Sequence, residues 1–235
     1  MDLPHLSASS LKTWGTCKLQ FYADKVLQVP RQEPHELTKM GSAVHYAFER
    51  SENKDAISKI PETCEELELT EELSELATTL TQTCEDWGWW EGIDELDHCI
   101  SEQEFLIDIG EGVKLKGFID RLDIKGNQAT ILDIKTQSKK FTEEELRKNL
   151  QADIYNLAAR KLFPQIQGVI SVEFWVLRHE IQSVNRTEKD AEETANRLRE
   201  QGAKMLAWDS DKHPDASAGN HCKWCNYLDQ CPEWN

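Results

Sequence analysis

The stretch Gly117–Lys135, GFIDRLDIKGNQATILDIK, decides the expected fold of this chain. It contains two strand-like runs that flank Gly126-Asn127, a dipeptide typical of the two-residue turn that closes a tight hairpin. A turn of that length sets the register of the hairpin, and this register places Asp120 directly opposite Asp133. Like charges in this arrangement destabilise a sheet unless a cation lies between them, so the hairpin predicts a divalent metal site.

Lys135 extends the candidate site, because it follows Asp133 by two positions and side chains two apart in a strand share a face. Two interpretations are open at this point. The three charged residues could form an ordinary solvated face with a surface ion pair, and a one-residue bulge would remove the pairing of the acids. The other hairpin residues are largely apolar, which favours a covered hairpin, and a covered acid requires a partner.

Length and composition indicate a soluble, cytoplasmic protein. A chain of 235 residues is long enough for one substantial domain. No apolar run approaches the roughly 20 residues of a membrane span, and the first residues, MDLPHLSASS, lack the basic and apolar regions of a signal peptide. Seven cysteines in such a chain favour metal ligands or free thiols over disulfides.

The net charge of -16 is unevenly distributed along the chain. Residues 52–111 contain 19 acidic and two basic side chains, whereas the rest of the chain has a net charge of +1. Much of this acidic segment has a helical apolar pattern, which predicts a helical insertion at residues 52–100. Its charge would repel a phosphate backbone or attract a basic partner, and a basic groove elsewhere in the chain stays open.

The order of the other elements predicts an α/β fold. Strands at residues 102–109 and 113–124, together with the second hairpin strand, form an antiparallel meander. Residues 169–177, VISVEFWVL, are dense in β-forming residues and predict a further, central strand. Residues 187–208 have the pattern of a charged amphipathic helix. The expected architecture is therefore a mixed central sheet with an antiparallel meander, flanked by helices.

A helix that is predicted to begin near Thr38 contains His45. Val44 and Phe48, which are four residues apart, mark its buried side, and His45 lies one step round from that side. Taken by itself, a histidine beside an apolar face is more often a hydrogen-bonded core residue than a metal ligand. His45 is therefore a candidate ligand whose role depends on what lies near it in the fold.

A second predicted helix follows the hairpin. Thr142 and Glu145 form a capping-box signature for its first turn, and the helix is expected to run to about Phe163. Gln151 and Tyr155 lie four residues apart on this helix, so their side chains share a face.

The C-terminal segment carries cysteines at metal-ligand spacing. Cys222 and Cys225 form a C-x2-C pair, and Cys231 follows close enough to reach the same centre. His221 or another residue could complete a zinc site, whereas Cys17 offers a fourth sulfur from the far end of the chain. A centre that includes Cys17 would bind both ends of the chain together, and spacing by itself favours neither zinc nor an iron-sulfur cluster.

Taken together, these motifs resemble a known family. The chain looks like the RecB-like branch of the PD-(D/E)XK nucleases, and it is similar to the iron-sulfur members of that branch, such as the CRISPR-associated adaptation exonucleases and the AddB-type nuclease domains. Asp133 stands where many relatives carry glutamate. The resemblance runs from Leu6 to Pro232 and rests on these motifs: His45 in a helix, Gly117-Phe-Ile-Asp120, Leu132-Asp133-Ile-Lys135-Thr136, Gln151-x3-Tyr155, and Cys17 with C-x2-C-x5-C from Cys222 to Cys231.

The resemblance implies roles for these residues within a restriction-endonuclease-like core. It implies that Mg2+ or Mn2+ is held by His45, Asp120, Asp133 and the Ile134 carbonyl, and that a 4Fe-4S cluster is held by Cys17, Cys222, Cys225 and Cys231. A histidine ligand favours Mn2+ more than an all-oxygen site would. The implied catalytic residues are Asp120, Asp133, Lys135, Gln151 and Tyr155, with Lys135 orienting or activating water.

The chain is thus expected to form a single nuclease domain, 1–235, with the acidic insertion at 52–100 and an iron-sulfur cap at 1–30 and 209–235. We expect a cytoplasmic, metal-dependent DNA exonuclease that acts on single-stranded DNA or DNA ends in recombination, repair or CRISPR-type spacer processing, and a phage gene could encode it. A homo-oligomer, or a recombination or CRISPR adaptation partner, is compatible with the family. The alternatives are a catalytically silent DNA-binding module of the same fold and a zinc-stabilised adaptor.

Overall fold

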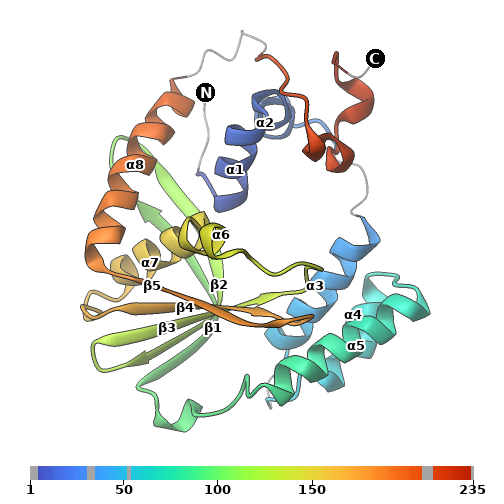
Figure 1. Cartoon of the computed structure of the whole chain (residues 1–235), viewed down its shortest axis with the longest axis vertical. Coiled ribbons are helices and arrows are strands. Elements are labelled where there is room, and N and C mark those ends of the chain that lie inside the picture. Colours follow the sequence, from blue (N-terminus) through green and yellow to red (C-terminus); the bar gives the residue numbers. More distant parts are fainter. Residues whose placement is uncertain (1–4, 31–34, 52–53, 208–213, 234–235) are drawn as a thin grey trace. The chain divides into compact units, whose positions relative to one another are not determined.

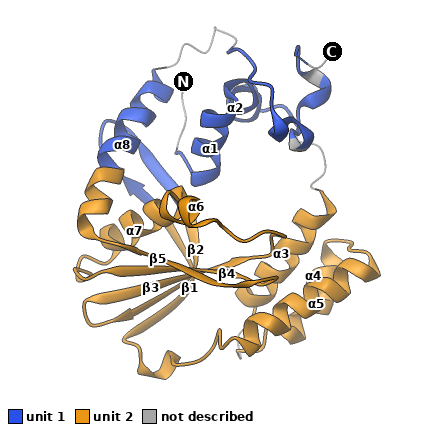
Figure 2. Cartoon of the chain, in the orientation of Figure 1, with its two compact units in different colours: residues 1–34, 106–117, 195–235 blue, residues 35–105, 118–194 orange. Residues whose placement is uncertain are grey.

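The computed structural model describes residues 5–30, 35–51, 54–207 and 214–233. The chain divides into two compact units (Figure 2). The first unit comprises residues 1–34, 106–117 and 195–235, and the second comprises residues 35–105 and 118–194. Within the described ranges, no helix has both the length and the apolar character needed to cross a membrane.

The described residues form a five-stranded mixed sheet whose strands follow one another in sequence order (Figure 1). The β2 and β3 strands are antiparallel, β3 and β4 are parallel, and β4 and β5 are antiparallel. This mixed sheet with flanking helices confirms the predicted fold class. The strands are β1 (His98–Asp108), β2 (Lys114–Lys125), β3 (Gln128–Lys135), β4 (Ile170–Val176) and β5 (Glu180–Arg186).

The hairpin of β2 and β3 has the predicted register. Gly126 has a φ of 62°, a conformation that glycine adopts without strain, and it occupies the first position of the two-residue turn. Asp120 and Asp133 occupy the next position of the same register, beyond the last recorded pair. The recorded pairs, which contain no bulge, are Lys125 with Gln128, Ile124 with Ala129, Asp123 with Thr130, Leu122 with Ile131 and Arg121 with Leu132.

Helices of the second unit cover both faces of its part of the sheet. On one face, α3 to α5 pack against Leu132, Ile134 and Trp175 in a continuous apolar core. On the other face, α7 contacts the sheet where Tyr155 packs edge-on against Phe105. The elements are α3 (Glu36–Glu49), η1 (Ile57–Lys59), α4 (Ile60–Glu66), α5 (Glu71–Asp86), η2 (Ile93–Glu95), α6 (Glu143–Arg147), α7 (Leu150–Leu162) and α8 (Glu188–Leu206), of which α8 continues into the first unit.

The helix predicted from Thr142 to about Phe163 is instead two helices. Its first turn is as predicted, because Thr142 and Glu145 form a reciprocal capping box at the start of α6. The chain then breaks before Asn149, whose side chain accepts hydrogen bonds from the backbone amides of Gln151 and Ala152. This side-chain cap starts α7 as a new helix, so the prediction of one continuous helix was wrong.

Strand β5 was missing from the predicted elements. Its sequence, EIQSVNR, has two apolar residues among seven and lacks the dense β-forming character of β4. It lies at the end of the strand order, where it pairs with β4 on one side. An edge strand needs less apolar surface than a central one, because one of its sides is not covered by another strand.

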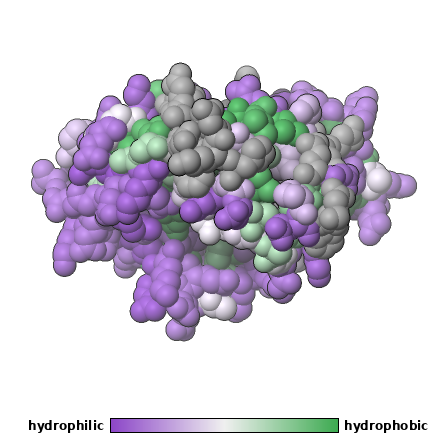
Figure 3. All heavy atoms as spheres, turned by 90° about the horizontal axis from the view of Figure 1, so that it is seen from above, coloured by the Kyte–Doolittle hydropathy of each residue, from purple (hydrophilic) through white to green (hydrophobic). Residues whose placement is uncertain are grey.

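The first unit contains α1 (Ala8–Thr16), α2 (Lys18–Lys25), η3 (Asn220–Trp224) and η4 (Leu228–Gln230). Ser7 caps α1, because its side chain accepts a hydrogen bond from the backbone amide of Ser10. The Tyr227 hydroxyl donates to Asp24 Oδ1 at 2.9 Å, so the C-terminal segment is bound to α2. Residues 209–220 are rich in Asp, Pro, Ser and Gly, which predicts a loop, and part of this segment lies outside the described residues. The face drawn in Figure 3 is mostly hydrophilic, with smaller hydrophobic areas.

Candidate active site

Asp133 is the most deeply buried acid of the candidate site. It lies on β3 with 1% of its surface exposed. Its Oδ1 accepts hydrogen bonds from Tyr155 Oη at 2.9 Å and from Gln151 Nε2 at 3.0 Å. Burial, followed by the charge of Asp133, raises the pKa of Tyr155 well above its usual value, which keeps the phenol a donor. The first turns of α7 therefore hold the carboxylate in place.

Lys135 lies beside the other oxygen of the same carboxylate. Its Nζ is 2.5 Å from Asp133 Oδ2, and it donates to Gln151 Oε1 at 3.0 Å. The 2.5 Å contact is an ion pair without the angles of a directed hydrogen bond, and Asp133 Oδ2 has no hydrogen-bond partner among the described residues. This buried oxygen consequently keeps a lone pair that can bind a cation.

Asp120 reaches the same place from β2. Its Oδ2 accepts a hydrogen bond from the Ile134 amide at 2.7 Å and lies 3.5 Å from His45 Nδ1. Burial, followed by the nearby charge of Asp133, raises the pKa of Asp120 to about 6. Both causes disfavour a charged carboxylate at this position, and a bound divalent cation would stabilise the charged form.

Glu102 is a further acid at the site, and the sequence motifs did not single it out. One oxygen of Glu102, one of Asp120 and a ring nitrogen of His45 all lie within 4.8 Å of one another, a spacing suited to a shared metal ion. Burial and the neighbouring acids raise the pKa of Glu102 to about 8. In the sequence, Glu102 is one of several acids at the start of a strand, so nothing distinguishes it before the fold is known.

A close contact between α3 and the end of β3 positions His45. Gly41 lies one turn before His45 on α3, and a Cβ atom at Gly41 would lie 2.8 Å from Thr136 Oγ1. Any side chain at this position would push the helix and Thr136 apart. Glycine therefore permits the approach that carries the His45 ring to Asp120.

The structure brings the predicted site residues together within the second unit. Side chains from α3, β2, β3 and α7 converge, and the donor set of carboxylates and one imidazole suits Mg2+ or Mn2+. The catalytic and metal-binding roles, including that of the Ile134 carbonyl, stay predictions. The predicted residues that the contacts above connect are His45, Asp120, Asp133, Ile134, Lys135, Gln151 and Tyr155.

The four cysteines with predicted metal-ligand spacing belong to the first unit. Cys17 is buried between α1 and α2. Burial raises the pKa of the Cys225 thiol, and so do the nearby Cys17, Cys222 and Cys231, which shows that the four residues are neighbours. Tetrahedral zinc, with Zn–S bonds of about 2.3 Å, would draw its sulfurs to about 3.8 Å from one another. No three cysteine sulfurs of the described residues lie within 4.8 Å of one another.

The remaining cysteines belong to the second unit. Cys64 and Cys84 are buried in its apolar core, and Cys99 lies on β1. Burial is the main cause that raises the pKa of each of these three thiols. A raised pKa keeps a thiol protonated and unreactive, so these three cysteines are interpreted as ordinary thiols.

Comparison with known proteins establishes the family. The sequence model of the PD-(D/E)XK nuclease superfamily matches residues 5–232, so the protein belongs to this superfamily. A solved structure from Eubacterium rectale, described as a putative exonuclease, has a TM-score of 0.62 and 14% sequence identity, over 95% of this chain and 88% of that chain. The structure of SSO0001 gives a TM-score of 0.44 and 17% identity, over 100% and 89%. No curated protein sequence matches.

These comparisons fix the superfamily and the fold. At 14% identity, the Eubacterium rectale structure is evidence for a shared fold alone. Members of this superfamily usually use divalent metals, which agrees with the acidic site described above. Assignment to the RecB-like iron-sulfur branch stays a prediction.

Replacement of Gly41 by alanine tests the positioning of His45. We expect Gly41→Ala to weaken Mn2+ binding about tenfold in calorimetric titration, because residues that orient a metal ligand have effects of that size. The double variant Gly41→Ala/Thr136→Ala should recover most of the affinity, since it removes the atom that the new Cβ would meet. Gly15→Ala is the matched control, because a Cβ there has no atom within 4 Å. Equal affinities for all four proteins would contradict the positioning role.

Proposed function

We propose that this protein is a divalent-metal-dependent deoxyribonuclease that hydrolyses phosphodiester bonds. The observation that carries the proposal is the convergence of Asp120, Asp133 and Lys135 in a member of the PD-(D/E)XK superfamily, with His45 beside Asp120. Two acids at facing cross-strand positions, one buried and one largely covered, have little structural value by themselves. They are consistent with a site that is completed by a cation.

The metal ligands in this proposal are His45, Asp120, Asp133 and the Ile134 carbonyl, with Glu102 as an added ligand. A bound Mg2+ or Mn2+ would stabilise the charge on the phosphoryl oxygens and lower the pKa of the attacking water. His45, Glu102 and Asp120 supply the closely spaced donor atoms, and Asp133 Oδ2 supplies a buried oxygen. The backbone amide of Ile134 holds the Asp120 carboxylate in the orientation needed.

Lys135 supplies positive charge beside the reacting phosphate. Asp133 and Gln151 both contact its Nζ, so the ammonium is oriented before substrate binds. An oriented charge stabilises the transition state without the cost of reorganisation. Gln151 and Tyr155 were predicted as catalytic, and their hydrogen bonds to Asp133 support a role in positioning this carboxylate.

Single-stranded DNA or a DNA end is the proposed substrate. Phe118 is 49% exposed and precedes Asp120 by two positions on β2, so both side chains project from the same face of the strand. Their separation along the strand is about 7 Å. An exposed ring at that distance could stack on a base next to the scissile phosphate, whereas the bases of an intact duplex are already stacked. The exonuclease description of the Eubacterium rectale protein is consistent with action at ends.

We also propose that Cys17, Cys222, Cys225 and Cys231 hold a structural 4Fe-4S cluster. The four thiols are neighbours in the first unit, and four cysteines that include a C-x2-C pair are a ligand set that such a cluster uses. The cluster would lock the C-terminal segment to α2, where Tyr227 already bonds Asp24. Zinc at the same cysteines is the alternative.

The wider context of the proposal follows the family resemblance. We place the enzyme in the cytoplasm, in recombination, repair or CRISPR-type spacer processing. In this proposal residues 1–235 form one nuclease domain, 52–100 are its acidic insertion, and 1–30 and 209–235 are its iron-sulfur cap. Self-association or a partner from one of these processes is part of the same proposal.

The role of Asp133 is tested by Asp133→Asn, which keeps the shape of the side chain. We expect cleavage of labelled DNA in Mg2+ or Mn2+ to fall at least about a thousandfold, because one oxygen ligand and its charge are lost. Chelator should abolish the wild-type activity. Glu180→Gln, on the edge strand, should leave the rate unchanged. Substantial nuclease activity in Asp133→Asn would defeat the assignment.

Phe118→Ala tests the choice of substrate. We expect KM for single-stranded DNA to rise about 5- to 100-fold with little change in kcat, which is the range of base-stacking effects. Phe118→Trp should retain affinity because it retains a stacking surface, whereas Phe118→Leu should behave like alanine. If the Phe118→Leu and Phe118→Trp variants bind DNA equally well, Phe118 has no stacking role.

The cluster is tested by preparing the protein without oxygen. The expected result is a brown protein with about four iron atoms and four sulfides per chain. Cys225→Ser should lose the colour and lower the melting temperature, while Cys99→Ser should keep both. If the wild-type protein is colourless and contains zinc, the cluster proposal is wrong and the zinc alternative holds.

A further inference from the structure

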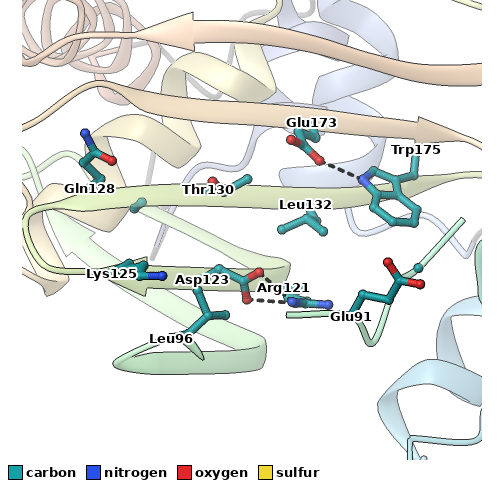
Figure 4. A pocket seen from close by; sticks show the side chains of 12 residues that line it. Glu91, Leu96, Arg121, Asp123, Lys125, Gln128, Thr130, Leu132, Glu173 and Trp175 are labelled. Carbon is teal, nitrogen blue, oxygen red and sulfur yellow. Dashed lines mark hydrogen bonds and ion pairs between the residues drawn. The ribbon is translucent and has the colours of Figure 1, made fainter. Parts of the chain in front are cut away.

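A pocket, drawn in Figure 4, lies on the sheet face opposite the candidate active site. Its volume is about 360 Å3, and all of its lining residues belong to the second unit. Leu132 and Arg121 line it, and each is adjacent in sequence to a residue of the active-site face. Leu132, Leu96, Ala129 and Trp175 form apolar walls, and most of the other lining side chains are polar or charged. A pocket of this size accommodates one long side chain and its backbone.

The charges that line the pocket do not balance. Arg121 Nε and Nη2 bind Asp123 at 2.8 and 2.6 Å, and Lys125 Nζ lies 3.4 Å from Glu95. These contacts neutralise both cations. Glu91 and Glu173 also line the pocket. Neither carboxylate forms an ion pair within the described part of the chain.

A hydrogen bond from Trp175 holds the Glu173 side chain in the lining of the pocket. The indole Nε1 donates to Glu173 Oε2 at 3.1 Å, and both side chains project from β4 (Figure 4). Glu91 comes from the turn that follows α5. Two unpaired carboxylates beside an apolar wall suit a cation on an aliphatic stem, which is the chemistry of an arginine or lysine side chain.

Arg121 shows a second unmet requirement in the same pocket. It is 2% exposed, and its Nη1 has no hydrogen-bond partner among the described residues. A buried donor without an acceptor costs free energy, and a ligand that brings an acceptor would recover it. A peptide carries carbonyl oxygens beside its side chains, whereas a small polyamine carries none.

The surroundings of the pocket favour a cationic ligand. Glu91 follows α5, and the exposed acids of α4 and α5 have few basic neighbours in sequence. Their field attracts cations and repels the phosphate backbone of DNA. The pocket is therefore unsuited to the substrate proposed for the opposite face of the sheet.

We infer that this pocket binds an arginine or lysine side chain from a basic segment of a partner protein. Glu91 and Glu173 pair with its cation, Leu132 and Trp175 contact its stem, and Arg121 Nη1 donates to a peptide carbonyl. The acidic helices α4 and α5 guide the basic segment to the pocket. This inference does not depend on the proposed nuclease activity.

The probe is the tripeptide acetyl-Arg-Lys-Arg-amide, titrated into the full chain at low salt by calorimetry. We expect Glu91→Gln/Glu173→Gln to weaken binding about tenfold, since each lost ion pair contributes a few-fold. Glu71→Gln/Glu75→Gln, which removes the same charge from exposed positions of α5, should weaken it less than about twofold. The proposed binding site would be overturned if the two double variants lost the same affinity for the tripeptide, or if the tripeptide did not bind at all.

Two further arms keep the test decisive. Thr130→Arg places a cation in the pocket, so it should weaken tripeptide binding as much as Glu91→Gln/Glu173→Gln does. Spermidine carries the same charge as the tripeptide without a carbonyl and should bind about fivefold more weakly or worse. Equal affinity for spermidine would overturn the peptide assignment. DNA cleavage by Glu91→Gln/Glu173→Gln should match the wild type, and a loss of cleavage would contradict a separate site.

Discussion

The mutual repulsion of Asp120 and Asp133 is the constraint on which the candidate site depends. The hairpin register places these acids at adjacent cross-strand positions, and the fold compensates part of their charge. The Ile134 amide bonds one carboxylate, while Lys135 and the polar groups of α7 contact the other. Burial, followed by the charge of Asp133, raises the pKa of Asp120, so the charged form of this carboxylate needs further stabilisation. A divalent cation is the simplest completion, and it is also what phosphodiester hydrolysis requires.

Each contact with these acids depends on where a helix begins or how closely it packs. Asn149 ends the previous helical segment and starts α7, which places Gln151 and Tyr155 in the turns that face Asp133. Gly41 lets α3 approach the end of β3 and brings His45 within reach of Asp120. The site is therefore held by rigid elements, which suits chemistry that requires fixed geometry.

The two faces of the sheet carry different chemistry because side chains alternate along each strand. On β3, Asp133 and Lys135 project toward α7, whereas Leu132 and Ile134 project into the core formed with α3 to α5. The acid-rich helices α4 and α5 pack on that second side, where the pocket that contains Arg121 also lies. This separation would allow the proposed nuclease site and the proposed basic-segment site to coexist in a chain with a net charge of -16.

The hairpin, its register and the mixed sheet could be predicted from the sequence, because turn chemistry and strand alternation are local properties. The shared helical face of Gln151 and Tyr155 was predictable for the same reason. The approach of Glu102 to His45 and Asp120 could not be predicted, because these residues come from separate elements that are brought together by packing. Three other features also could not be predicted from local sequence. They are the helix break at Asn149, the edge strand β5 and the pocket carboxylates that form no ion pair among the described residues. They arise where a cap, an edge or a distant partner overrides the local pattern.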